Sequence, residues 1–485
     1  MKESKLKQNN VQEDTLTEVY KRLCEIVGAE NASNKKFVRL CYSRDASSIP
    51  GRLPDIVVQP STTDEVREIL ILANETLIPV YTRGSGSGLW GGCIPYKGGI
   101  VLDCAGRLNK FIRLDEKTLT CVVQPGLTFG ELEAELNKDG YRERVAPEGG
   151  LSSSIGGHFV THGVGFGSGI YGNQGDAVIG LEVVLPNGDI VKTGSQMNPN
   201  AHGHFFRYSY CHDLTGLFCG SEGTLGVITQ LAVKVEKIPE DRGYSTWGFP
   251  DLELCGNAVY RMRAEGLNLV FAFFRTRKGI ELVSGMPSPH EGTLLIILEG
   301  PSWRVKKELE MVSSICKEEG GTDLGPDLAT TYWFDRFRYG PGGTYKVGSR
   351  NILPGIIPLR ELGYYCKKLG EILDDVCIKY GFVREYEQLG KVTSYSLGGF
   401  QTDRAWVVYA NIFYEEWNPD EWPEKVRKAS SEATKRFIEI GFVPYRMGGI
   451  WPGAVKATGS AYQLIKTIKD AVDPNGIMNP GVLDL

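Results

Sequence analysis

The stretch Tyr81-Thr-Arg-Gly-Ser-Gly-Ser-Gly-Leu-Trp-Gly-Gly92 follows directly on an apolar segment that is typical of a strand. Its alternating glycine and serine residues let successive backbone N–H groups converge on an anion without interference from Cβ atoms, and the serine hydroxyls add donors. The stretch has neither the Gly-Lys-Ser/Thr of a Walker A loop nor the G-x-G-x-x-G of a Rossmann fold. It therefore predicts a pyrophosphate-binding loop of another kind, with a plain tight turn as the alternative.

Two further glycine-rich stretches lie in the same half of the chain. The first, Pro147-Glu-Gly-Gly-Leu-Ser-Ser-Ser-Ile-Gly-Gly157, leads through Gly163 and Gly165 to Tyr171-Gly172, and the second is LFCGSEGTLGVIT at 217–229. Glycine makes up 60 of the 485 residues, above the usual ~7%, and is concentrated between residues 84 and 226. Three such stretches in one module predict a long ligand that lies along the backbone.

The expected secondary structure alternates around these stretches. Strands are predicted at 54–60, 78–81, 100–103 and 120–124, helices at 63–73 and 129–138, and a hairpin at Asn187-Gly188. From about 241 to 440 glycine becomes rarer, and strands at 270–274 and 294–298 alternate with amphipathic helices at 304–318, 362–380 and 421–440. We predict an α+β protein with an N-terminal helical segment at 1–50, a cofactor module at 51–240, a second domain at 241–440 and a tail at 441–485.

Charge and composition exclude several classes of protein. With 54 Lys+Arg against 59 Asp+Glu, the net charge of −5 excludes a nucleic-acid binder that works by bulk charge. The N-terminus, MKESKLKQNN, has no apolar core and no apolar run is long enough to span a membrane, so a cytoplasmic protein is expected. The eleven cysteines contain no C-x-x-C pair, which excludes zinc-ribbon and ferredoxin spacings. No metal site is predicted.

Taken together, the motifs resemble the FAD-binding domain of the vanillyl-alcohol oxidase and p-cresol methylhydroxylase (PCMH) family, which includes glycolate and D-lactate dehydrogenases. The resemblance covers residues 50–240 and 440–482. It is carried by RGSGSGLWGG, CVVQPGLTFGEL (121–132), SSIGG (153–157), LEVVLPNGDIVKTG (181–194), LFCGSEGTLGVIT and the tail VDPNGIMNPG (472–481). It implies a two-subdomain PCMH-type FAD domain, a separate α/β cap domain at 241–440 and a tail that returns to the FAD domain.

The resemblance also implies how FAD is held. FAD lies extended across the domain, with its pyrophosphate on the loop Arg83–Gly88 and its isoalloxazine ring facing the cap. The implied contacts are Arg83, Gly84, Ser85, Gly86, Ser87, Gly88, Pro147, Ser153, Ser154, Ile155, Gly156, Gly157, Gly163, Gly165, Tyr171, Gly172, Glu222, Gly223, Gly226, Val227, Ile228 and Asn479.

Noncovalent FAD is expected. Some family members attach FAD through a histidine of the first loop, where this chain has Ser87, and others through a histidine or tyrosine of the cap. All six histidines lie at or before His290, so a histidine late in the cap is excluded. A link to a cap tyrosine stays open.

The segment Val443-Pro-Tyr-Arg-Met-Gly448 resembles the Tyr-Arg pair of the vanillyl-alcohol oxidase branch. A phenol beside a guanidinium suits an anionic substrate oxygen, so Tyr445 and Arg446 are candidate catalytic residues, with a surface ion pair as the alternative. Trp90 stands where that branch has a tyrosine, and Asn173 where it has an aspartate after Tyr-Gly. Trp90 and Asn173 are candidates to contact the substrate or the flavin, and the lost aspartate disfavours phenol oxidation in particular.

Two other segments bear on the substrate. The lactate and glycolate branch has a histidine-rich metal-binding segment late in the cap, but residues 394–411 contain no histidine, which disfavours metal-assisted hydroxy-acid oxidation. His202, His204 and His212 are interpreted as loop or packing residues. The aromatic stretch Tyr332-Trp-Phe-Asp-Arg-Phe-Arg-Tyr339 is interpreted either as the lining of an aromatic, anion-tolerant pocket or as an aromatic core.

We predict an FAD-dependent oxidoreductase that moves a hydride from an sp³ carbon of an alcohol or phenolic substrate, anionic or phenolic in character, to flavin N5. A 2-hydroxy acid dehydrogenase of the lactate or glycolate type, an electron-transfer or accessory subunit with a vestigial substrate site, and a nucleotide-sugar reductase are the alternatives. Cys104 follows a strand that passes the flavin in the family and would obstruct O₂, so a dehydrogenase with a protein or quinone acceptor is expected. The oligomeric state, a homo-oligomer included, is left open.

Overall fold

In the computed structural model, which describes residues 2–338 and 347–485, the three strands predicted around the first glycine loop join one further short strand in a four-stranded sheet of order β1-β2-β4-β3. Strands β2, β4 and β3 run parallel. The bounds are β1 (Ala32–Ser33), β2 (Ile56–Val58), β3 (Val80–Arg83) and β4 (Ile100–Asp103). Helix α3 (Thr63–Thr76), capped by the Thr62 side chain, packs on this sheet together with α1 (Lys2–Val27). The predictions of β2, β3, β4 and helix α3 are confirmed, whereas β1 was not predicted.

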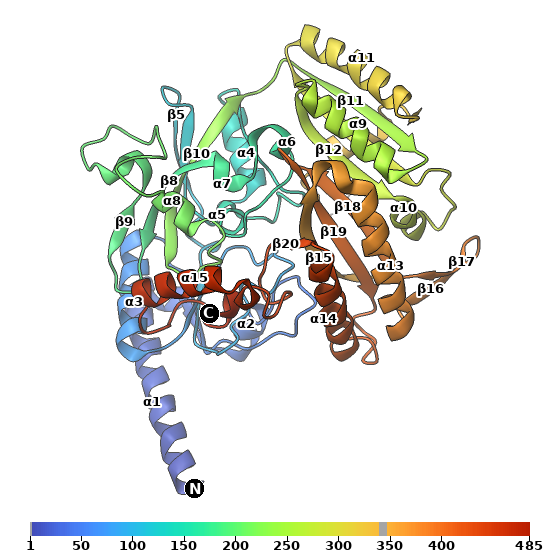
Figure 1. Cartoon of the computed structure of the whole chain (residues 1–485). Helices are drawn as coiled ribbons and strands as arrows, with labels where there is room; N and C mark the ends of the chain where they lie inside the picture. Colours follow the sequence, from blue (N-terminus) through green and yellow to red (C-terminus); the bar gives the residue numbers. More distant parts are fainter. Residues whose placement is uncertain (1, 339–346) are drawn as a thin grey trace.

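Helix α1 is longer than the helical segment predicted within the first fifty residues. Its added N-terminal turns hold lysine, glutamate and glutamine and no glycine or proline, so helix propensity continues it toward the N-terminus. Figure 1 shows these turns projecting from the body of the molecule. The short helix α2 (Lys36–Cys41) follows.

A second, six-stranded antiparallel sheet completes the first lobe. Its order is β5-β6-β10-β8-β9, with β7 paired to β10. The predicted capping box is present, because Thr128 and Glu131 bond each other's backbone N–H at the start of α4. The hairpin turns at Gly188, whose φ is 87°. The bounds are β5 (Phe111–Asp115), β6 (Thr120–Val123), β7 (Tyr141–Glu143), β8 (Val178–Val184), β9 (Ile190–Lys192), β10 (Val227–Lys237), α4 (Phe129–Asn137), α5 (Ile155–Phe159), α6 (Ser168–Tyr171), α7 (Gln174–Ala177) and α8 (Leu214–Phe218).

The second lobe is built on an eight-stranded antiparallel sheet of order β14-β11-β13-β12-β18-β19-β15-β20. Its strands are β11 (Asp241–Phe249), β12 (Leu269–Thr276), β13 (Gly292–Gly300), β14 (Thr322–Asp323), β15 (Ser349–Pro358), β18 (Tyr395–Gln401), β19 (Ala405–Tyr414) and β20 (Val443–Pro444). Its helices are α9 (Leu252–Ala264), α10 (Arg277–Ser284), α11 (Ser302–Glu318), α12 (Asp327–Phe334), α13 (Leu362–Tyr380) and α14 (Glu424–Glu439), and a small hairpin joins β16 (Val383–Tyr386) to β17 (Gly390–Thr393). The α+β class predicted from the sequence is confirmed.

The two faces of the eight-stranded sheet have different neighbours. One face forms the largest core with α9, α11, α13 and α14. The other carries Phe271, Phe273 and Phe400, which pack with Val164 and Phe166 of the first lobe. Because side chains alternate along a strand, the residues that share the face of Phe273 and Phe400 point toward the first lobe.

After β20 the chain crosses back to the first lobe. Helix α15 (Ser460–Val472) lies beside the six-stranded sheet, and Met478 forms a bridge with Val80 of β3. The backbone N–H of Asn479 donates to the Val80 carbonyl. The last residues thus join the edge strand that leads into the first glycine loop.

Candidate functional site

A cavity of about 250 Å³ lies where the two lobes meet. One wall consists of glycine and serine loops of the first lobe, and the other of side chains from β12, β15, β18 and β19. The predicted site residues that line it are Arg83, Gly84, Ser85, Gly86, Ser87, Gly88, Trp90, Pro147, Ser153, Ser154, Gly156, Gly157, Glu222, Gly223, Gly226, Val227, Ile228 and Arg446. The three glycine-rich stretches, far apart in the sequence, therefore meet at one cavity.

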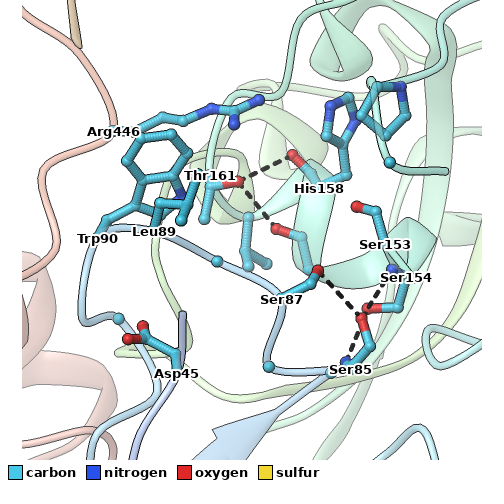
Figure 2. A pocket seen from close by; sticks show the side chains of 18 of the residues that line it. Asp45, Ser85, Ser87, Leu89, Trp90, Ser153, Ser154, His158, Thr161 and Arg446 are labelled. Atoms are coloured by element: carbon cyan, nitrogen blue, oxygen red, sulfur yellow. Dashed lines mark hydrogen bonds between the residues drawn. The ribbon is translucent and has the colours of Figure 1, made fainter. Parts of the chain in front are cut away.

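The first two loops are tied together by their serines (Figure 2). The Ser85 N–H donates to Ser154 Oγ at 3.3 Å, and the Ser154 N–H donates to Ser85 Oγ at 3.1 Å. A Cβ on Gly84 would clash with Ser154 Oγ. Glycine at 84 therefore lets the loops meet, and the two serines fix them to each other.

The backbone of the first loop is open to a ligand. In the part of the chain that the structure describes, the N–H groups of Gly86, Ser87 and Gly88 donate to no protein acceptor. Gly86 has a φ of 68°, and a Cβ there would clash with the Arg83 guanidinium. That guanidinium donates to the Arg44 carbonyl at 2.9 Å. Unpaired amide donors beside a buried arginine suit phosphate oxygens.

Several predicted residues lie outside the cavity lining. The Tyr171 ring has the Arg142 and Arg144 guanidinium carbons at 5.7 and 5.2 Å from its centroid. Asn173 is the N-cap of α7, where its side chain accepts the Asp176 N–H at 3.3 Å. The Asn479 side chain accepts the Thr82 N–H and donates to the Glu222 carbonyl, both at 2.9 Å. The others outside the lining are Ile155, Gly163, Gly165, Gly172 and Tyr445. Any role of these residues toward ligand stays a prediction.

Tyr445 and Arg446 stay in contact, with the Arg446 guanidinium carbon 5.3 Å from the centroid of the Tyr445 ring, but of the two only Arg446 lines the cavity. The buried Tyr445 hydroxyl donates to the His162 carbonyl, whereas the Arg446 side chain lines the cavity. The Arg446 guanidinium carbon stands 4.8 Å from the centroid of the Trp90 ring and extends from Trp90 toward His158 (Figure 2). Arg446 and Trp90 thus meet at the cavity, whereas Tyr445 lies outside its lining, and the catalytic roles of these three residues stay predictions.

His158 lines the same part of the cavity and was not predicted. It follows the SSIGG motif directly, on helix α5. Burial, and then the positive charge of Arg446, lower the pKa of His158 to about 3. The imidazole is therefore neutral at physiological pH and can act as a hydrogen-bonding group but not as a cation.

The second lobe supplies the polar side chains of the opposite wall. On β12, Arg275 lies two residues after Phe273, and on β18 and β19 Ser396 and Asn411 share the inward face with Phe400 and Tyr409. Arg350 of β15 also lines the cavity. The alternation of side chains along four neighbouring strands thus gathers two arginines, two small polar groups and a set of aromatic rings on one surface.

A half-buried carboxyl joins the two walls. The Tyr332 hydroxyl of α12 donates to Glu148 Oε1, which belongs to the second glycine loop. Burial raises the pKa of Glu148, while the Tyr332 hydrogen bond and the charges of Arg350 and Arg275 oppose that rise. Burial and the Glu148 charge raise the pKa of Tyr332 well above its usual value. Tyr332 therefore stays a hydrogen-bond donor, and its hydrogen bond to Glu148 favours the ionised form of that carboxyl.

Comparison with known proteins assigns this architecture. The FAD binding domain model matches residues 54–194, and the model of the C-terminal domain of FAD linked oxidases matches residues 238–483, just over half of the chain. The chain belongs to the FAD-linked oxidases. It is an FAD-dependent oxidoreductase.

Named relatives of this FAD-linked oxidase include the glycolate oxidase subunit GlcD of Bacillus subtilis, which is 28% identical over 480 residues, 96% of each chain. The mitochondrial D-lactate dehydrogenase (cytochrome) of Arabidopsis thaliana is 30% identical over 450 residues, 89% of this chain and 73% of the relative. The fold is similar to that of p-cresol methylhydroxylase with substrate bound, with a TM-score of 0.84, 19% identity and 97% of each chain covered. The predicted PCMH-type fold is confirmed.

The lining residues fit the cofactor of a FAD-linked oxidase. The unpaired N–H groups at 86–88 would hold the pyrophosphate, and the small residues Gly156, Gly157, Gly223 and Gly226 let an extended ligand approach the backbone. Two lining tyrosines, Tyr332 and Tyr409, belong to the second lobe. Among the described residues, these two tyrosines leave a covalent tyrosine link to FAD open.

The described residues of this FAD-linked oxidase include neither a metal-binding cluster nor a membrane-spanning helix. Among residues 2–338 and 347–485, no three His, Cys, Asp or Glu side chains gather where they could hold a metal ion. No helix in those ranges is long and apolar enough to cross a membrane.

The sequence offered signals for some of the lining residues that were not predicted. Arg275 follows LVFAFF, so the alternation of that strand already put Arg275 on the face of Phe271 and Phe273. Of the aromatic stretch, Tyr332 lines the cavity, Trp333 lies in a neighbouring core and Tyr339 lies outside the described residues. Asp45, in a segment without periodicity, had no signal at all.

Proposed function

We propose that this FAD-linked oxidase oxidises the hydroxyl-bearing carbon of a 2-hydroxy acid with an apolar side chain. The observation that carries the proposal is that Arg275 and Arg350 line the same cavity as the Glu148–Tyr332 hydrogen bond, which joins its two walls. Guanidinium groups are suited to a carboxylate, which they bind through two parallel hydrogen bonds. The names of the glycolate oxidase and D-lactate dehydrogenase relatives support the same substrate class.

Charge at this wall favours an anionic substrate. Arg275 and Arg350 bring two positive charges, and Glu148 brings one negative charge when ionised. A carboxylate can pair with a guanidinium group, whereas a neutral alcohol offers no charge to it. This wall therefore favours an anionic substrate. The aromatic rings of Phe273 and Phe400 would contact the apolar part of the substrate.

Each lining residue then has a definite task. Bound FAD supplies the acceptor for the hydride that leaves the substrate carbon. Arg275 and Arg350 orient the carboxylate, Glu148 accepts the hydroxyl proton, and Tyr332 holds Glu148 in place and favours its ionised form. Arg446, with Trp90 below it, stabilises negative charge that develops on the substrate oxygen. The hydroxyl carbon is oxidised to a carbonyl as two electrons leave with the hydride.

An aromatic alcohol or a phenol is the second candidate substrate. Phe273, Phe400 and Tyr409 form an aromatic wall, and Trp90 and Arg446 stand at the opposite loop. A phenolate would pair with Arg446 in the same way as the developing alkoxide. This candidate differs from the first in needing no carboxylate partner at Arg275 and Arg350.

Cys104, at the end of β4, bears on the identity of the electron acceptor. Cys104 is buried at the end of β4 and lines the cavity, where its side chain would obstruct O₂. We therefore infer a dehydrogenase that passes electrons to a protein or a quinone. We also propose that the protein acts in the cytoplasm and that it holds FAD noncovalently. Acid precipitation should leave FAD in the supernatant, and colour that stays with the polypeptide would contradict the noncovalent assignment.

Anaerobic bleaching of the holoenzyme flavin tests the substrate class. The panel is glycolate, lactate, 2-hydroxy-3-phenylpropanoate, benzyl alcohol and 4-ethylphenol. We expect bleaching by the hydroxy acids, most strongly by the phenyl acid. Bleaching by the alcohol or the phenol alone would favour the second candidate. Bleaching by dithionite alone would favour an accessory subunit with a vestigial site.

A further inference from the structure

Two buried carboxyl groups lie behind the loop that carries Trp90. Asp45 is 7% exposed and Glu222 is 5% exposed, and both border the cavity. They come from the N-terminal segment and from the third glycine stretch, so neither is close to Trp90 or Arg446 in sequence. Each contacts a segment that presents one of these two residues.

Glu222 contacts the segment of Arg446. The Gly448 N–H donates to both carboxylate oxygens of Glu222, at 3.0 and 3.1 Å. Arg446 has a φ of 52° and Gly448 a φ of 41°. Glycine adopts a positive φ freely, but the left-handed conformation of Arg446 is costly for a chain that is free to relax. A fixed partner for the Gly448 N–H therefore helps to hold this turn.

The backbone of Glu222 is itself fixed by the C-terminal tail. Its carbonyl accepts from Asn479 Nδ2 at 2.9 Å, and the carbonyl of Thr224 accepts from the buried Lys469 Nζ at 2.7 Å. Glu222 has a φ of 47°. The tail therefore holds Glu222 in a strained conformation that aims its carboxyl at Gly448.

Asp45 contacts the segment of Trp90. Its carboxyl accepts the Gly91 N–H at 2.8 Å and the Ser47 N–H at 3.0 Å. The two segments meet directly, because the Gly449 N–H donates to the Trp90 carbonyl at 2.6 Å. The Trp90 turn and the Arg446 turn are thus joined to each other and each is anchored by one carboxyl.

We propose that Glu222 and Asp45 are positioning residues that hold Arg446 against Trp90 at the cavity, with Glu222 acting through Gly448 and not as a direct contact of FAD. The consequence for turnover rests on the role proposed above for Arg446. The positioning itself does not depend on the identity of the substrate.

The charge of Glu222 adds a pH dependence that can be tested. Burial raises the pKa of Glu222 to about 7, and the charge of Asp45 adds to this rise, whereas the Gly448 hydrogen bond and the Arg446 charge oppose it. Cys93 and Tyr96 also face Glu222, and Arg83 faces Asp45. Above pH 7 the carboxylate is ionised and the anchor is complete, whereas below pH 7 protonation weakens it.

The direct test is hydrogen–deuterium exchange of the peptide 443–450 in the FAD-loaded enzyme. Glu222→Gln removes the charge and retains the size. We expect exchange of this peptide to be about tenfold faster than in wild type at pH 8, the scale of one charge-assisted hydrogen bond. Wild-type exchange, corrected for the intrinsic effect of pH, should lose protection as pH falls through 7, and Glu222→Gln should lose that step. Unchanged exchange in the variant would overturn the proposal.

The matched control is Glu182→Gln. Glu182 of β8 accepts the Thr63 and Thr229 hydroxyls and does not line the cavity, so its loss should not alter exchange of 443–450. Should Glu222→Gln not fold, Asp45→Asn with the peptide that contains Gly91 gives the same test, and unchanged exchange there would overturn the anchor.

Two other readouts separate positioning from cofactor contact. We expect Glu222→Gln to keep its dissociation constant for FAD within about threefold and to reduce flavin at saturating substrate about tenfold more slowly, the free-energy scale of one charge-assisted hydrogen bond. A large loss of FAD affinity with normal reduction once FAD is saturating would make Glu222 a cofactor contact and overturn the proposal. If hydroxy acids fail as substrates, the exchange result still decides the positioning claim.

Discussion

The first-lobe wall of the cavity consists of backbone from contiguous glycine and serine stretches, whereas the second-lobe wall consists of side chains from four separate strands. The first wall needs residues that keep Cβ atoms away, as Gly84 does beside Ser154. The second needs charge and shape, as Arg275 and Arg350 provide. The glycine and serine backbone can thus hold the cofactor closely, whereas the side chains of the second wall would contact the substrate that we propose.

The largest expected effect is a loss of FAD affinity when a side chain is added to the first wall. A Cβ on Gly156 would lie 2.5 Å from Pro125 Cβ and 2.9 Å from the Pro125 carbonyl oxygen, both rigid. We expect Gly156→Ala to lower FAD affinity by ~10² or more, because an overpacked loop must shift. FAD content after gel filtration measures this. Gly370→Ala on α13, where the nearest atom to the new Cβ is Tyr395 Oη at 3.3 Å, should keep its FAD. An equal loss of FAD from both variants would contradict the role of the first wall in holding FAD.

The next effect concerns the second wall. Arg350→Met should slow flavin reduction by a 2-hydroxy acid by ~10², the scale for one preorganised charged group, and leave the FAD content intact. Stopped-flow reduction under nitrogen gives the rate. Arg404→Met, at a side chain that is 92% exposed, serves as the control. A wild-type rate in Arg350→Met would show that the carboxylate is held elsewhere.

A smaller effect is expected where the walls meet. Tyr332→Phe should slow reduction about tenfold, because a hydrogen bond to a charged group is lost. The Tyr332 hydrogen bond lowers the pKa of Glu148, so its removal raises that pKa. A rate that requires ionised Glu148 should then rise with pH at higher values than in wild type. An acid limb that does not move would exclude Glu148 as the proton acceptor.

The smallest effect concerns O₂. Cys104 lines the cavity and is 5% exposed, so Cys104→Gly opens space beside the flavin loop. We expect slow reoxidation of the reduced wild-type enzyme by oxygenated buffer and a severalfold faster rate in Cys104→Gly. Rapid wild-type reoxidation would make the enzyme an oxidase.

The contrast between the walls also explains what the sequence could predict. The residues of the first wall could be predicted because they lie in contiguous sequence motifs. The structure brings Arg83–Gly88, Ser153–Ser154 and Gly223 to one cavity. Arg350 and Asn411 lie 61 positions apart and meet only because β15 pairs with β19, a pairing that no local pattern specifies. The helix cap at Asn173 shows the opposite case, where Asn-Gln-Gly-Asp is typical of an N-cap and the family resemblance drew attention to catalysis instead.

The most direct measurement of the central claim compares 2-hydroxy-3-phenylpropanoate with 2-phenylethanol in anaerobic stopped-flow reduction of the wild-type flavin. Both carry a hydroxyl and a phenyl ring, and the carboxylate is the feature that Arg275 and Arg350 would bind. A site built for a charged group rejects an analogue that lacks it by large factors, so the acid should reduce the flavin at least ~10²-fold faster per unit concentration. Equal rates, or a faster alcohol, would contradict the assignment of the second wall to carboxylate recognition.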